Sequence, residues 1–280
     1  MISETAQFLA RGQQSMASYV GWLDELEADI AAQLARIIGR CRIGLSAEGQ
    51  VVGFTGVEWA PNSRTAWIIP MGEPIEELFA AGIALAPDET MTFAIAFEVG
   101  NSTMVDLCTR YGFSQTNAET LMTIRSDEFV RPVALGTDGF DVRPYSPDAR
   151  EALIEIHPAG AHFSIDDFVA ELDDRHYLFT IWDGERCIGM CDANRDQAGT
   201  TGNIENVMIQ ADHRRRGAGR RIVAAALETL FADGADHVEL TVRVTNDPAR
   251  SLYRSIGFRA LQTVAAYKAP REAARQTASG

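Results

Sequence analysis

The chain has 280 residues, of which 46% are hydrophobic, and a formal net charge of −14. Its length and apolar content suffice for two packed domains, whereas its acidic balance disfavours nucleic acids and anionic membranes as partners, because both repel a net anion. Four cysteines are too few for a disulfide scaffold, so we interpret them as buried thiols in a reducing cytoplasm: Cys41, Cys108, Cys187 and Cys191.

Neither a membrane span nor a metal site is predicted. No apolar stretch approaches the roughly 18 residues that cross a bilayer, and no basic segment leads into an apolar run at the start. The five histidines include no pair at a spacing typical of a metal site. We therefore expect a cytoplasmic protein with no metal, no nucleic acid and no membrane partner.

An internal repeat organises the chain. Residues 98–113, EVGNSTMVDLCTRYGF, align without a gap with residues 243–258, RVTNDPARSLYRSIGF. The matched positions include Asn101 with Asn246, Leu107 with Leu252, Gly112 with Gly257 and Phe113 with Phe258. We interpret the repeat as two copies of one α/β unit and predict a first domain at 1–130, a linker at 131–139, a second domain at 140–268 and a frayed tail at 269–280.

The first copy is acidic where a strand is expected to lead into a helix. Its segment MGEPIEEL, residues 71–78, contains Glu73, Glu76 and Glu77. Carboxylates at this position would repel phosphate. We therefore expect the first copy to be degenerate, retained as a packing partner or as a wall of an acceptor site.

In the second copy, the pattern NIENVMI at 203–209 predicts a strand. The apolar residues after it have helical spacing and predict a helix: Ile222, Val223, Ala226, Leu227, Leu230 and Phe231. Alternation from Val238 to Val244 predicts another strand, and Asn246 or Asp247 is expected to cap a helix that ends at Gly257.

The segment RRRGAGRR, residues 214–221, lies between the first of these strands and its helix. The first turn of a helix has amides without intrahelical partners, and its dipole favours anions. Glycines at 217 and 219 let a ligand approach the backbone, and arginines add forked donors for phosphate oxygens. We therefore predict a diphosphate site, with a solvated surface run of arginines as the alternative.

Three ordered segments resemble the GNAT superfamily of N-acetyltransferases: FDVRPYSPDAREAL from Phe140, VMIQADHRRRGAGRRIV, and NDPARSLYRSIGF. The second fills the acyl-CoA signature R/Q-x-x-G-x-G/A with Arg214, Gly217 and Gly219, although Ala211 stands where many members have proline. The resemblance covers about residues 140–268 and implies two tandem GNAT-like α/β domains, each a mixed sheet flanked by helices. It implies acetyl-CoA binding by these residues: Val207, Met208, Ile209, Arg214, Arg215, Arg216, Gly217, Ala218, Gly219, Arg220, Asn246 and Tyr253.

The same resemblance suggests the residues that carry acetyl transfer. Glu205 is the candidate general base, with an ordinary exposed strand glutamate as the alternative. The backbone amide of Ile209 is the candidate donor to the oxyanion. Tyr253 is the candidate acid for the leaving thiolate, with a core aromatic ring as the alternative, and the first copy has Cys108 at that position.

Acceptor sites in this superfamily are built largely by the first helices, which here correspond to residues 157–177. This segment is acidic through Asp166, Asp167, Glu171, Asp173 and Asp174. The acids would attract a cationic amine, although a solvated helix face, with Ser164 and Asp167 as a capping box, also explains them. For the segment as a whole we expect a cationic acceptor.

We therefore predict an acyl-CoA-dependent N-acetyltransferase that moves acetyl from acetyl-CoA to the primary amine of a small molecule by direct attack in the second copy. One alternative is a thiol-conjugate acetyltransferase similar to mycothiol synthase, whose two-copy layout this chain resembles. The other is a non-catalytic acyl-CoA-binding sensor. We expect a monomer or a homodimer, since a tandem copy can substitute for a dimer partner.

Overall fold

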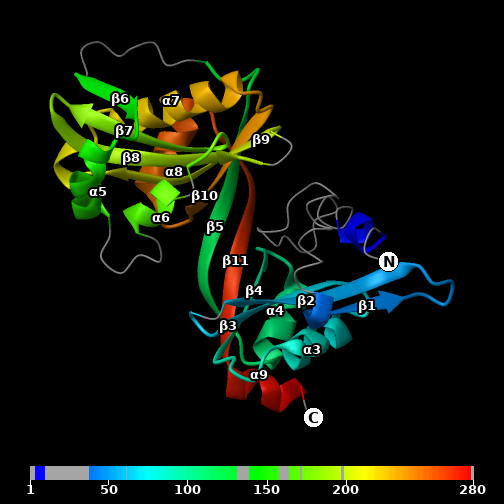
Figure 1. Ribbon diagram of the computed structural model, residues 1–280. Coiled ribbons are helices and arrows are strands. Elements are labelled where there is room, and N and C mark those ends of the chain that lie inside the picture. The colour runs from blue at the N-terminus through cyan, green and yellow to red at the C-terminus, as the bar shows by residue number, and fades with distance from the viewer. Residues whose placement is uncertain are drawn as a thin grey trace. The chain divides into compact units, whose positions relative to one another are not determined.

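The computed structural model, shown in Figure 1, describes residues 4–9, 38–60, 62–130, 139–157, 164–170, 172–196 and 199–278. The chain splits into two compact units, residues 1–119 with 262–280 and residues 120–261. Each unit is a mixed sheet flanked by helices, which confirms the predicted α/β class. The predicted linker falls mainly on residues 131–138, which lie outside the described residues.

Unit 1 has the strand order β1-β2-β3-β4-β11-β5. Its elements, in chain order, are η1 (Ile38–Arg40), β1 (Cys41–Leu45), β2 (Val51–Ala60), β3 (Thr65–Gly72), α3 (Ile75–Leu85), β4 (Thr92–Glu98), α4 (Ser102–Arg110) and the first part of β5 (Ser114–Arg125). Helices α3 and α4 pack on the sheet through Phe79, Ile83 and Leu107, all of them buried.

Unit 2 has the strand order β11-β5-β10-β9-β8-β7-β6. After the end of β5 it contains β6 (Phe140–Pro144), η2 (Pro147–Ala149), α5 (Arg150–Ile156), α6 (Ile165–Ala170), β7 (His176–Asp183), β8 (Arg186–Arg195), β9 (Thr201–Ile209), η3 (Ala211–His213), α7 (Ala218–Ala232), β10 (His237–Arg243), α8 (Asp247–Ile256) and the start of β11 (Arg259–Pro270). One buried cluster joins α7 and α8 to the sheet, and a separate one joins α5 and α6 to it.

The boundaries of the two units differ from the predicted domain boundaries because the last strand of each copy enters the other sheet. Residues 264–270 of β11 pair antiparallel with residues 92–98 of β4 in unit 1. The end of β5, from Thr120, belongs to unit 2, where β5 lies beside β10. An alternating pattern identifies a strand without identifying its neighbour, so the repeat could not reveal this exchange.

The predicted frayed tail is wrong. Strand β11 continues to Pro270, and residues Arg271–Ala278 form helix α9. Ala274 is fully buried in the core of unit 1, and the Arg275 guanidinium donates to the carbonyl of Ala86 at 3.2 Å. The polar composition of this segment reflects a helix with one buried face rather than disorder.

The two copies use the same local chemistry, as the repeat predicted. Asn101 caps α4 by accepting from the amide of Met104 at 3.1 Å, and Asn246 caps α8 by accepting from the amide of Ala249 at 3.3 Å. A glycine with positive φ follows each helix, at 72° for Gly112 and 122° for Gly257. Both asparagines and both glycines therefore mark equivalent helix ends.

Two neighbouring strands of unit 2 diverge beside the arginine and glycine turn. Strands β9 and β10 pair in parallel from Thr201 with His237 to Asn203 with Glu239. Beyond these pairs β9 continues to Ile209 and β10 to Arg243. Because the strands part before they end, the last residues of β9 present an edge toward the starts of α7 and α8.

The prediction of four buried thiols holds for three of them and not for Cys41. Cys108, Cys187 and Cys191 are buried, Cys41 is half-buried, and all four are free. Burial raises the pKa of the Cys108 thiol to about 12, so this group stays protonated at neutral pH. In the described part of the chain, no helix combines the length and apolarity needed for a membrane span.

Candidate functional site

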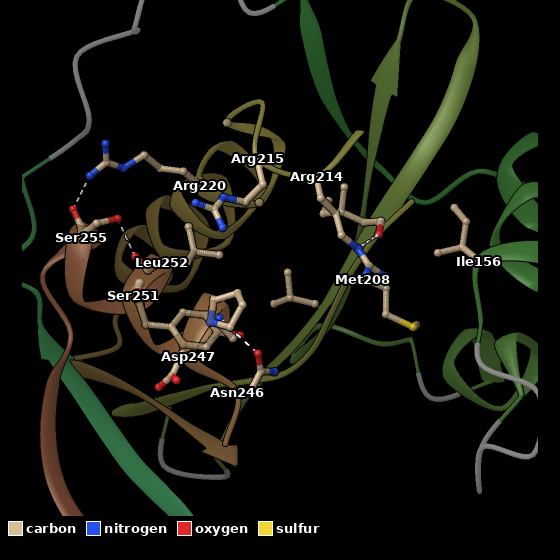
Figure 2. Close-up of a pocket in the computed structure, with 17 residues that line it drawn as sticks. Ile156, Met208, Arg214, Arg215, Arg220, Asn246, Asp247, Ser251, Leu252 and Ser255 are labelled. Carbon is tan, nitrogen blue, oxygen red and sulfur yellow. Dashed lines mark hydrogen bonds between the residues drawn. The ribbon is translucent and has the colours of Figure 1, made fainter. Parts of the chain in front are cut away.

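A cavity of about 860 Å³ opens in unit 2 between the end of β9, the start of α7 and one face of α8 (Figure 2). Ile156, at the end of α5, closes another side. Ten of the predicted site residues line it: Val207, Met208, Ile209, Arg214, Arg215, Gly217, Gly219, Arg220, Asn246 and Tyr253. The structure therefore brings together two of the three segments that the sequence analysis selected, VMIQADHRRRGAGRRIV and NDPARSLYRSIGF, whereas no residue of FDVRPYSPDAREAL lines the cavity.

The turn before α7 has the backbone geometry of an exposed helix start. Gly217 is the N-cap residue and has a φ of 91°, a left-handed conformation that favours glycine. A Cβ on Gly219 would lie 3.1 Å from Leu252 Cδ2, so a larger residue would narrow the gap between α7 and α8. Gly217 thus allows the left-handed backbone turn, and Gly219 keeps the space between α7 and α8 open.

The arginines of the turn separate into two groups. Arg214 donates from Nε to the carbonyl of Ile209 at 2.9 Å, and Arg215 lines the cavity beside it (Figure 2). Arg216 turns away, with a nitrogen 3.4 Å from Asp183 and its guanidinium 5.5 Å from the ring centre of Phe140. Arg216 therefore does not line the cavity, although the sequence placed it among the cofactor-binding residues.

Arg220 extends from α7 toward the end of α8, where it donates to the carbonyl of Ser255 (Figure 2). Its Nε atom is buried and has no hydrogen-bond partner among the described residues. A buried donor without an acceptor is unfavourable by roughly 1–3 kcal/mol, and more when the group is charged. The Nε atom itself is shielded from the cavity, whereas other atoms of Arg220 line it, so its positive charge can attract an anion there.

The backbone of β9 is arranged so that Ile209 faces the cavity side of the strand. The amide of Gln210 donates to Ile188 of β8 at 2.8 Å, and the antiparallel ladder pairs Ile209 with Gly189. Polar groups alternate along an antiparallel strand, so the N–H and C=O of Ile209 point away from β8. Arg214 bonds that carbonyl, and the adjacent N–H points the same way.

Tyr253 lies in the wall of the cavity on α8. The side chain is buried, and its ring packs edge-on against Phe258 at a centroid distance of 5.8 Å. Burial, and to a smaller extent the neighbouring Cys191, raises the pKa of the Tyr253 phenol above its usual value near 10. Its hydroxyl has no hydrogen-bond partner within the described part of the chain, so it is available to a ligand.

Glu205 does not line the cavity. It lies on β9 two residues before Val207, about 7 Å along a strand, and its side chain is exposed. The Nδ2 amide of Asn194 donates to its Oε1 at 2.7 Å. The structure therefore places Glu205 near one end of the cavity, on a hydrogen bond that the sequence did not predict.

Two acids of the proposed acceptor segment, Asp166 and Asp173, form hydrogen bonds with neighbouring residues. Asp166 accepts two bonds from Arg150, at 2.7 and 2.6 Å, and these lower its pKa. Asp173 accepts from the amides of Arg175 and His176 and from the His176 ring, which lowers its pKa to about 2. The side chain of Asp167 and all of Glu171 lie outside the described residues. For Asp166 and Asp173 the structure favours a local structural role.

Sequence reasoning missed much of the wall that α8 provides: Asp247, Pro248, Ala249, Ser251, Leu252 and Ser255. Asn246, Ala249 and Tyr253 lie on one side of the helix at spacings of three and four residues, and this periodicity is the signal that could have found the rest. Ile156 of α5 was also missed, because contact between α5 and the end of β9 is a tertiary feature.

The equivalent junction in the first copy lacks an open helix start. Helix α3 follows Pro74, which has no amide hydrogen, and the Glu73 carboxylate accepts from the amide of Ile75 at 3.2 Å. Glu76 pairs with Arg110 at 2.5 Å. A carboxylate of the protein thus already engages the amide that a phosphate would need.

Comparison with known protein families identifies one domain. Residues 143–258 match the acetyltransferase (GNAT) family. The chain is also 25% identical over 170 residues to a mycothiol acetyltransferase from Pseudarthrobacter chlorophenolicus, an alignment covering 55% of this chain and 53% of that protein. The chain thus spans about half the length of this curated relative. It spans 21% and 17% of two further mycothiol acetyltransferases, from Corynebacterium jeikeium and Clavibacter michiganensis.

Two solved structures share the fold over most of the chain. A GCN5-related N-acetyltransferase from Sphaerobacter thermophilus superposes with a TM-score of 0.71 at 17% identity, over 96% of this chain and 92% of that one. A tandem GNAT protein from the clavulanic acid biosynthesis pathway superposes with a TM-score of 0.70 at 14% identity, over 96% and 94%. These likenesses support a tandem arrangement of the fold.

Proposed function

Residues 143–258 form a domain of the acetyltransferase (GNAT) family, and on this premise we propose that unit 2 transfers acetyl from acetyl-CoA to the primary amine of a small molecule. The cavity in unit 2 carries this proposal. Its wall combines a glycine-opened helix start with Arg214, Arg215 and Arg220 on one side and the exposed edge of β9 on another.

The diphosphate of acetyl-CoA is proposed to bind at the start of α7. The first amides of the helix point out of it, and its dipole favours negative charge there. Arg220 supplies a positive charge in the wall of the cavity, and Arg215 adds a second. Gly219 supports this assignment, because its missing side chain leaves room between the helices.

The acetyl group would then lie along β9, near Ile209. Glu205 takes a proton from the acceptor amine, directly or through water, and the freed nitrogen pair forms the C–N bond. The carbonyl pair moves onto oxygen, where the Ile209 amide donates a hydrogen bond. When that pair returns, the C–S bond breaks and the thiolate leaves.

Tyr253 is proposed to donate a hydrogen bond to the departing sulfur. Its raised pKa keeps the phenol protonated at neutral pH, so a donor is always present. The same shift makes complete transfer to a thiolate of pKa about 8.5 unfavourable, so solvent supplies the final proton. After the C–N bond has formed, the nitrogen loses a second proton to solvent, and Glu205 also releases its proton to solvent. Of the two protons that leave the ammonium, one is matched by the proton that reaches sulfur and the other is the net proton released.

A thiol-conjugate acetyltransferase is the second candidate function. The match to mycothiol acetyltransferases favours it, and it differs from the first only in the acceptor. Because Asp166 and Asp173 are engaged by neighbouring residues, these two carboxylates give less support to a cationic acceptor than the acidic sequence of the segment suggested.

Calorimetry with acetyl-CoA, followed by thiol release over a panel of amines, tests the proposal. We expect binding at one site per chain and thiol release with at least one primary amine of the panel. Binding without release on any acceptor would favour a non-catalytic sensor. No heat of binding would refute the proposed donor site.

A further inference from the structure

Glu205 occupies a bulge in strand β9. The ladder between β8 and β9 pairs Asp192 with Asn206 and Ala193 with Ile204, so Glu205 is the extra residue between these pairs. A bulge breaks the alternation of side chains and can direct one toward a position that a regular strand would not reach. The direction of the Glu205 side chain is therefore not set by the strand alone.

Two asparagines set it instead. Asn194 of β8 lies opposite Asn203 of β9, and the Nδ2 of Asn203 donates to the Oδ1 of Asn194 at 3.1 Å. The Nδ2 of Asn194 in turn donates to Oε1 of Glu205 at 2.7 Å. The second carboxylate oxygen, Oε2, has no partner among the residues that the structure describes.

The chemistry of these groups fixes the orientation of both amides. An ionised carboxylate only accepts hydrogen bonds, so Asn194 must present its NH₂ to Glu205. The Asn194 carbonyl then faces Asn203, which must present its own NH₂ to that carbonyl. The three side chains form a directed chain of donors that ends on one oxygen of Glu205.

We propose that Asn194, oriented by Asn203, is a positioning residue that fixes the Glu205 carboxylate with one oxygen engaged and the other presented to the acceptor amine. This inference rests on the proposed function, in which Glu205 is the base. Asn194 and Asn203 lie on the face of the sheet that carries Met190 and Met208, which α5 and α6 cover. The acceptor would approach Glu205 from this face.

Loss of the Asn194 donor lowers the fraction of time that the carboxylate spends in productive geometry. Neither asparagine lines the acetyl-CoA cavity, so the effect falls on turnover rather than on binding of the donor. For Asn194→Ala we expect kcat to fall roughly tenfold. The KM for acetyl-CoA should change less than about twofold, because the turn at the start of α7 is untouched.

Two further variants separate hydrogen-bond donation from shape. Asn194→Asp keeps the size and outline of the side chain but removes the donor and adds a carboxylate beside Glu205. Its kcat should fall at least as far as that of Asn194→Ala. The matched control is Asn206→Ala, because Asn206 also faces β8 but donates to Asp192 at 3.3 Å. This control should retain kcat within about twofold of the wild-type value.

A double-mutant cycle with Glu205→Gln completes the test. We expect Glu205→Gln to lower kcat about 100-fold and Asn194→Ala to add nothing in that background. Additive losses in the double variant, or wild-type turnover in Asn194→Asp, would overturn the positioning role while leaving the base assignment intact. Wild-type turnover in Glu205→Gln would refute the base assignment and the positioning role together, and acetyl-CoA binding would remain the separate measure of the donor site.

Discussion

The two strand-to-helix junctions of the molecule differ in whether the start of the helix is open or already engaged by a side chain of the protein. At α7 the helix starts after Gly217, and residues 214–221 around it contain five arginines and no acidic residue. At α3 the helix starts after Pro74, and Glu73 accepts from the amide of Ile75. The start of α7 thus leaves its amides and dipole uncompensated, which is the condition that favours an anion, and the start of α3 does not.

The contact between α3 and α4 in unit 1 also differs from the contact between α7 and α8 in unit 2. In unit 1, Glu76 at the start of α3 pairs with Arg110 at the end of α4. In unit 2, Arg220 at the start of α7 bonds to the backbone of Ser255, which the repeat aligns with Arg110. The first copy neutralises its charge internally, whereas the second retains a positive charge that faces the cavity.

Of the changes considered, reversing the charge of Arg220 should weaken acetyl-CoA binding most strongly. Arg220→Glu makes the second junction resemble the first and should raise the Kd for acetyl-CoA roughly 100-fold, because a charged hydrogen bond is lost and a like charge is added. Isothermal titration calorimetry measures the change. Arg221→Glu has the same change in net charge on an exposed position of α7 and should leave the Kd within about threefold. Equal losses in both variants would contradict the assignment of Arg220.

Removing the Tyr253 hydroxyl should have the next largest effect. Tyr253→Phe keeps the ring packed on Phe258. It should lower kcat about tenfold, because one hydrogen bond to the transition state is lost. Because burial raises the pKa of this phenol above 10, the group stays protonated below that pH, and the ratio of the two rates should stay constant from pH 7 to about 9.5. A ratio that changes with pH in this range, or an unchanged kcat, would remove Tyr253 from the chemistry.

Narrowing the gap between α7 and α8 should have a smaller effect. Gly219→Val places a branched side chain against Leu252 and should raise the KM for acetyl-CoA about fivefold. Ala225→Val introduces the same side chain farther along α7, outside this cavity, and provides the control for helix stability. If the two variants showed the same KM and the same loss of melting temperature, clearance at Gly219 would have no role in binding.

Substitutions at the junction of the first copy should have the smallest effect on turnover and on acetyl-CoA binding. Glu73→Gln with Glu76→Gln removes two negative charges at its junction, but Pro74 still lacks an amide and no arginine run is present. We expect kcat and the Kd for acetyl-CoA to stay within about twofold of wild type. A second acetyl-CoA site in this variant, seen as a stoichiometry of two, would mean that charge alone separates the copies.

Much of the site followed from local rules. The N-cap asparagines, the glycines after α4 and α8 and the glycine-opened start of α7 all depend on residues close in sequence, and the structure confirms these helix ends. The resemblance to a family of acetyltransferases joined these segments into one site, and the cavity contains most of the residues that it implied.

The remainder depended on partners distant in sequence. The exchange of β5 and β11 moved the unit boundaries because neighbouring strands are chosen by the whole sheet. Arg216 turned toward Asp183, 33 positions away, and Asn194 found Glu205 across a bulge. A pattern of residue types cannot specify which of several similar side chains meets a given partner.

A crystal structure of the protein with coenzyme A would test the central claim most directly. We predict that the diphosphate lies at the start of α7, within hydrogen-bond distance of the backbone amides around Gly219 and of Arg220. Density for the diphosphate beside Glu73 at the start of α3, or away from both helix starts, would contradict the account.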